Sequence, residues 1–165
     1  MKYSMLLALA LVLPAIEASA GVATVSLTGT LLMTPSCKVT SADNRRIEVS
    51  FGDSVGISRV DGVQYRQPLN YHISCDNSKP AKTGLVLTLK GDIASFDTSK
   101  AALQTSVKGL GIRILQNGSP MVINQPIKVT PTALPALEAV LVKQSDVTLQ
   151  EGPFDAVATL MADYQ

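Results

Sequence analysis

Residues 152–165, the last fourteen of the chain, alternate between apolar and polar side chains with a period of two. That period is typical of a pleated β-strand, whose successive side chains point to opposite faces. A long apolar strand at this place is either a central strand, paired on both sides, or an edge strand that awaits a partner. Its apolar face would consist of Phe154, Ala156, Ala158, Leu160, Ala162 and Tyr164. Such a face needs a core, so this strand constrains the whole fold.

Length and composition favour one globular domain. The chain has 165 residues, of which 46% are hydrophobic and 16% charged, so it can bury a core and does not have the composition of a disordered chain. Aromatic residues make up 4%, and there is no Trp. The net charge is +1 without a basic cluster, which excludes an electrostatic surface for nucleic acid.

Residues 1–20 have the three parts of a secretory signal peptide. Lys2 supplies the positive charge, residues 5–13 form an apolar run, and Ala18-Ser19-Ala20 is a small-residue cleavage site. The apolar run is well short of the roughly 20 residues that span a bilayer. We therefore expect cleavage after Ala20 and export of the mature chain.

Export changes the meaning of the two cysteines, Cys37 and Cys75. In an oxidising compartment an even pair predicts a disulfide. A metal site would need more ligands than one histidine, His72, can supply. Leu69, Tyr71, Ile73 and Cys75 share one face of an expected strand, which directs Cys75 inward.

The first residues after the cleavage site, 21–34, alternate as clearly as the last strand does. One face carries Ala23, Val25, Leu27, Gly29 and Leu31, and Ser and Thr dominate the other. Gly29 leaves a notch in the apolar face, which is typical either of a bulge in an ordinary first strand or of the close approach of another backbone.

The rest of the chain predicts many short strands separated by turns. Asn117-Gly118 lies between residues 109–115 and 121–123 and is a strong hairpin signal. Ile47, Val49 and Phe51 alternate with polar residues and predict a short strand before the turn at Gly52-Asp53. We expect a single helical turn over residues 99–104 and a loop or irregular edge over residues 126–135. Without helical periodicity in the mature chain, this pattern predicts an all-β sandwich.

No pattern in the sequence supports catalysis. His72 lies in the middle of an expected strand, on its polar face, where a histidine is more often solvated than catalytic. The sequence has no nucleophile elbow, no phosphate-binding loop and no cluster of metal ligands. We therefore expect no cofactor, and a protein that is not an enzyme.

Four pieces in order resemble the pilin subunits of chaperone-usher fimbriae, of the type 1 and P pilus kind. They are residues 29–39 with the Pro35-Ser36-Cys37 sequence, residues 69–75 with the second half-cystine, residues 109–112 before the Asn-Gly turn, and the terminal run with Tyr164 next to last. The resemblance implies an incomplete immunoglobulin-like sandwich that lacks its last strand and is completed by donor-strand complementation. It divides the chain into a signal peptide (1–20), a donor-strand extension (21–34) and a pilin domain (35–165).

The resemblance also implies partners. A periplasmic chaperone would lend a strand to the open groove and hold the terminal carboxylate of Gln165, and at the outer-membrane usher the extension of the next subunit would replace it. The donor residues would be Ala23, Val25, Leu27, Gly29 and Leu31. The groove strand would carry Gly152, Phe154, Ala156, Ala158, Leu160, Ala162, Tyr164 and Gln165.

By this resemblance the protein is a fimbrial subunit that supports cell adhesion, exported through the periplasm to the cell surface. An extension and a single domain favour a shaft, adaptor or minor tip-fibrillum subunit, and the assembled fibre could contact a host glycan. A rival from another class is a secreted carbohydrate-binding sandwich, with Tyr65 and Arg66 as a small binding patch. A third alternative is a complete sandwich that needs no partner.

Overall fold

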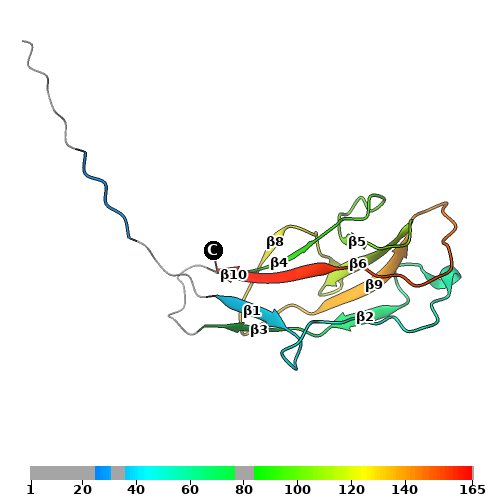
Figure 1. The fold of residues 1–165 in the computed structure, drawn as a ribbon, viewed down its shortest axis with the longest axis horizontal. Helices are drawn as coiled ribbons and strands as arrows, with labels where there is room; N and C mark the ends of the chain where they lie inside the picture. Colours follow the sequence, from blue (N-terminus) through cyan, green and yellow to red (C-terminus); the bar gives the residue numbers. More distant parts are fainter. Residues whose placement is uncertain (1–24, 31–35, 77–83, 165) are drawn as a thin grey trace, which may run out of the picture. The chain divides into compact units, whose positions relative to one another are not determined.

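The computed structural model describes residues 25–30, 36–76 and 84–164. The chain divides into two units, Met1–Leu32 and Met33–Gln165. The second unit contains every assigned element (Figure 1). These are β1 (Cys37–Thr40), the 3-10 turn η1 (Ile57–Arg59), β2 (Arg66–Leu69), β3 (His72–Cys75), β4 (Leu85–Gly91), β5 (Ala102–Gln104), β6 (Leu110–Gln116), β7 (Ser119–Pro120), β8 (Pro126–Val129), β9 (Leu137–Lys143) and β10 (Ala158–Tyr164).

The strands form three antiparallel sheets. The largest has the order β2-β9-β6-β5, with β7 paired to β6, and a second has the order β10-β4-β8. β1 and β3 form a separate pair. The segment 66–75 belongs to two sheets, because its first half, β2, pairs with β9 and its second half, β3, pairs with β1.

Alternate side chains of the two larger sheets meet in one core. β4 supplies Leu85, Leu87 and Leu89, which are between 0% and 3% exposed. The facing sheet contributes Ile114 from β6 and Leu137 from β9 to the same cluster. Layers of sheet joined by an apolar core are the architecture of a sandwich, so the expected all-β class is confirmed.

Local signals predicted some elements well. Asn117 and Gly118 have φ angles of 49° and 82°, and Gln116 pairs with Ser119 across them, as expected for a tight hairpin. The segment expected as a loop or irregular edge contains β8, an edge strand of four residues, so its edge alternative is the correct one.

Two other expectations are wrong. The helical turn expected over residues 99–104 is absent, because Ala102–Gln104 form β5 and pair with β6. The alternating residues 47–51 form no strand, although Val49 and Phe51 pack against the core as their spacing predicts. A pattern of side chains can direct residues inward without providing a hydrogen-bonding partner for the backbone.

Residues 25–30, the described part of the expected first strand, are exposed and form no strand. A β-strand needs a neighbour to bond with, and these residues pair with no segment that the structure describes. The expected signal peptide lies outside the described residues. Within the described ranges, no helix is long and apolar enough to cross a membrane.

Candidate functional site

The terminal strand β10 has one paired edge and one free edge. It pairs with β4 along its whole length, from Ala158 opposite Gly91 to Tyr164 opposite Leu85. No described strand forms a ladder with its other edge. The strand expected over residues 152–165 is therefore shorter, because β10 begins at Ala158. Of the two alternatives, a central strand or an edge strand, the structure has the edge strand.

The inner face of β10 is only half buried. Leu160 lies directly opposite Leu89 and Tyr164 directly opposite Leu85, yet both β10 residues are partly exposed whereas Leu85 and Leu89 are 2% and 3% exposed. The two strands share one sheet and one face, so the difference comes from the other side of β10. That side lacks the neighbour that β4 has in β8.

A groove of about 1240 Å³ lies along this free edge. One wall is residues 150–160, and the other is the segment 46–58, which follows β1 in the chain. Figure 1 shows β1 running beside β10, where the two elements are in contact. The floor consists of apolar core residues from both layers, among them Leu89, Leu103, Ile112 and Ile114.

The two walls meet through an aromatic pair. The ring centroids of Phe51 and Phe154 are 6.1 Å apart, with an angle of 41° between the ring planes. Both rings line the groove and pack on a second buried cluster, formed by Val60, Leu110, Leu141 and Leu149. The groove is thus crossed by an apolar contact near residue 154.

Most of the residues expected in the groove strand do line it. Gly152, Phe154, Ala156, Ala158 and Leu160 are lining residues. Ala162 instead belongs to the core, at 4% exposed, and Tyr164 is half-buried against that core. Gln165 lies outside the described residues. The second wall was not predicted as part of the site, although the alternation of Ile47, Val49 and Phe51 was a signal for it.

The expected donor residues are accessible where the structure describes them. Val25 and Leu27 are 77% and 91% exposed, which is unusual for side chains of their size. A Cβ atom added to Gly29 would meet no atom within 4 Å, so no contact with the described residues explains its lack of a side chain. Ala23 and Leu31 lie outside the described residues.

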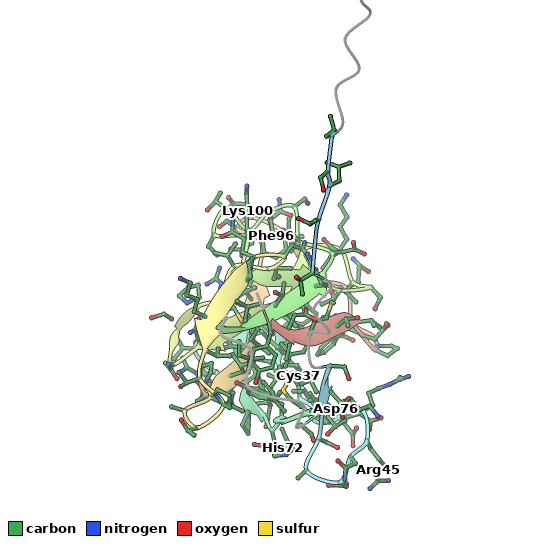
Figure 2. All side chains as sticks on the ribbon, turned by 90° about the vertical axis from the view of Figure 1, so that its left-hand side faces the viewer. Cys37, Arg45, His72, Asp76, Phe96 and Lys100 are labelled. Atoms are coloured by element: carbon green, nitrogen blue, oxygen red, sulfur yellow. A yellow bond between two sulfur atoms is a disulfide. The ribbon has the colours of Figure 1, made fainter. Side chains whose placement is uncertain are left out.

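The disulfide joins Cys37 in β1 to Cys75 in β3, as expected. The two residues are paired in register, with their Cα atoms 4.0 Å apart. Figure 2 shows the sulfur beside Cys37 and, farther out, His72 and Arg45 at the surface. The bond ties β1, which leads into the second wall of the groove, to the sandwich.

Comparisons with known proteins show to which family the chain is similar. The family model described as "Fimbrial protein" matches residues 25–165. The uncharacterized fimbrial-like protein YfcQ of Escherichia coli K12 is 36% identical over 141 residues, which is 83% of this chain and 84% of YfcQ. YfcR of the same strain is 34% identical over 72% of this chain and 69% of its own length.

The chain belongs to the fimbrial protein family. Three solved structures of pilus subunits share its fold. The P pilus rod subunit PapA matches with a TM-score of 0.58 and 24% identity, over 86% of this chain and all of PapA. The P pilus adaptor subunit PapF matches with a TM-score of 0.56 and 18% identity, over 81% of this chain and 98% of PapF. A chain from the structure of a chaperone-usher pilus matches with a TM-score of 0.59 and 21% identity, over 92% of this chain and all of that chain. This pilin therefore has the immunoglobulin-like sandwich of chaperone-usher subunits.

This family consists of structural fibre subunits, so the pilin is not an enzyme. His72 is exposed on the outer face of β3, as its place in the sequence predicts. Among the described residues, no group of three or more His, Cys, Asp or Glu side chains could hold a metal ion.

Both residues of the suggested glycan patch, Tyr65 and Arg66, make contacts within the sandwich. The hydroxyl of Tyr65 accepts a hydrogen bond of 2.8 Å from the N–H of Gly56, and its ring packs on the second buried cluster. The guanidinium of Arg66 lies 3.3 Å from the carboxylate of Glu138. These contacts give no support to the carbohydrate-binding alternative.

Proposed function

We propose that this pilin polymerises by donor-strand exchange, in which a strand from another molecule fills the groove beside β10. The observation that supports this best is the contrast between the two neighbours in one sheet, half-buried Leu160 and fully buried Leu89. A strand on the free edge of β10 would cover the apolar groove and bond with unpaired backbone groups. Strand addition of this kind takes affinity from backbone hydrogen bonds and specificity from alternate side-chain pockets.

The extension of a neighbouring subunit fits this role. Burying Val25, Leu27 and Leu31 would contribute roughly 1.5 to 3 kcal/mol each, or about 5 to 9 kcal/mol in total. The ordering of a free chain segment opposes this gain. The exposure of Val25 and Leu27 supports a partner outside their own unit. Gly29 would then lie where the groove is too shallow for a side chain.

A periplasmic chaperone would occupy the groove first. Its strand would protect the apolar surface, and its basic residues would bind the carboxylate of Gln165. At the outer-membrane usher, the extension of the next subunit would displace it, so the subunit reaches the cell surface within a fibre that supports adhesion. The protein would be a shaft, adaptor or minor tip-fibrillum subunit.

The test uses the mature chain, co-produced with its chaperone in an oxidising periplasm. A synthetic peptide of residues 21–33 is added to the purified complex, and displacement and thermal unfolding are measured. We expect the peptide to release the chaperone and to give a more heat-resistant complex.

The matched control is the same peptide with Leu27→Asp, which places a charge in an apolar groove and should abolish the exchange. A mature chain that is a stable monomer without the chaperone, and whose melting temperature the peptide does not change, would contradict the proposal. That result would favour a self-sufficient sandwich.

A further inference from the structure

The outer face of β10 is unusually apolar for a free edge. Val157, next to the strand, is 83% exposed and Met161 is 41% exposed, with exposed Thr159 between them. We call these three residues the outer triplet. Exposed large hydrophobic side chains are few in the described residues, and outside the extension the only other one is Val63. Two of them therefore lie on one side of β10, Met161 in the strand and Val157 in the residue directly before it.

Edge strands usually carry charges that prevent pairing with other chains. Here Asp155 and Asp163 flank the triplet, but no charged residue of β10 lies between them. On the neighbouring strand, exposed Lys90 of β4 lies directly opposite Thr159. The neutral stretch coincides with the part of β10 that borders the groove, because Ala156, Ala158 and Leu160 are its inward-facing neighbours. This portion of the edge lacks the usual protection against a pairing strand.

A strand that pairs with this edge has two faces, and only one enters the groove. If Val25, Leu27 and Gly29 face the groove, then Ser26, Thr28 and Thr30 must face outward, because side chains alternate. They would lie in the same surface layer as the outer triplet. Side chains on one face of adjacent strands contact each other directly or diagonally.

The chemistry of these outward residues suits the triplet. Thr is β-branched and packs well against Val, Thr and Met on a pleated surface. Residues 21–34 contain no charged residue, so the extension meets no repulsion from Asp155 or Asp163. A donor with acidic residues on its outward face would lose this packing and would be repelled by both carboxylates, whereas Lys90 of β4, opposite Thr159, could attract them only at the middle of the triplet.

We propose that the outer triplet is a second recognition surface, which selects donor strands by their outward face, and that its occupant is the extension of a second copy of this chain. The inference rests on the proposed donor-strand exchange and adds a specificity that the groove alone does not supply. It makes the subunit self-polymerising.

The experiment measures the affinity of the chaperone-bound pilin for peptides of residues 21–33. Two peptides keep the groove-facing residues intact and replace Ser26, Thr28 and Thr30 either all by Glu or all by Lys. On the acceptor, Met161→Glu and Thr159→Glu alter the outer face, and Val63→Glu is the control at an exposed apolar site elsewhere.

We expect the Glu peptide to bind the unchanged pilin at least about threefold more weakly than the native peptide, since cross-strand pairs contribute a few tenths to one kcal/mol each. Met161→Glu should weaken the native peptide about 1.5- to 5-fold, and the Lys peptide should recover that loss. Val63→Glu should change neither affinity. At high salt the differences between the charged peptides should shrink.

The inference is overturned if the Glu, Lys and native peptides bind the unchanged pilin equally, or if Met161→Glu and Thr159→Glu bind all three as the unchanged pilin does. Either result would leave donor-strand exchange intact, with specificity in the groove alone. If the native peptide binds the unchanged pilin no better than the Leu27→Asp control peptide does, then the proposed function itself fails.

Discussion

Asp97 organises the loop before β5 through one buried carboxylate. Its oxygens accept hydrogen bonds from the N–H groups of Ala101 and Ala102, at 2.9 and 2.8 Å, and from the hydroxyl of Ser99. The guanidinium of Arg113 in β6 lies 2.8 Å away. Burial raises the pKa of Asp97, but the hydrogen bonds from Ser99, Ala101, Arg113 and Ala102 outweigh it, so its pKa lies below its usual value.

We expect Asp97→Asn to lower the free energy of unfolding by about 1 to 3 kcal/mol at pH 7, because buried donors lose an acceptor. Since the folded-state pKa is depressed, the native stabilisation is present above the unfolded-state pKa and is lost as the pH falls through the folded-state pKa. Urea unfolding of the donor-complexed protein at pH 7 and in acid measures this.

The control for this change is Asp92→Asn, at an exposed carboxylate nearby. It should have little effect at either pH. If Asp97→Asn has the same unfolding midpoint as the unchanged protein at pH 7, the carboxylate does not hold the loop.

At the scale of elements, the disulfide holds β1 against β3. Its cysteines are 38 residues apart. Replacing both Cys37 and Cys75 by Ser should lower the free energy of unfolding by roughly 3 to 4 kcal/mol in the chain-entropy model. Denaturant unfolding of the complexed protein measures the loss. An unchanged midpoint would mean that pairing of β1 with β3 suffices by itself.

The aromatic pair across the groove should resist an incoming strand. An aromatic contact is worth about 0.5 to 1.5 kcal/mol, so Phe154→Leu should speed peptide entry by about two- to tenfold if the rings must separate. Stopped-flow fluorescence with a labelled peptide of residues 21–33 measures the rate. The matched control is Phe96→Leu, because Phe96 packs on Ala94, Ala102 and Val142 away from the groove. Equal rates for all three proteins would show that the rings do not separate during entry.

In the whole molecule, β10 lies at the end of its sheet and has a described neighbouring strand on one edge only. A donor peptide at about 100 times its Kd should stabilise the fold by about 2.7 kcal/mol and raise the melting temperature. Hydrogen exchange should slow in β10, whose second edge becomes paired. β9 is the internal reference, because β2 and β6 already flank it. Slowing in β9 alone, without a change in β10, would place the peptide elsewhere.

Features that depend on near neighbours in the chain were predictable from the residues alone. Alternation predicted the inward faces of β3 and β10, the Asn117-Gly118 pair predicted the hairpin, and the two cysteines predicted the disulfide. The four family pieces were also local patterns, so the membership in the fimbrial family was predictable. Each of these signals lies within a few residues or depends on residue types alone.

Features that depend on residues distant in sequence could not be predicted in this way. β5 is a strand because β6 pairs with it and the Asp97 carboxylate takes the N–H groups of Ala101 and Ala102, so a helical turn does not form. The groove beside β10 lies between segments about a hundred residues apart in the sequence, residues 46–58 and 150–160. The contact of Phe51 with Phe154 joins the same two segments. Alternation shows that a strand has an apolar face, but only the arrangement of the other strands determines whether that face is covered.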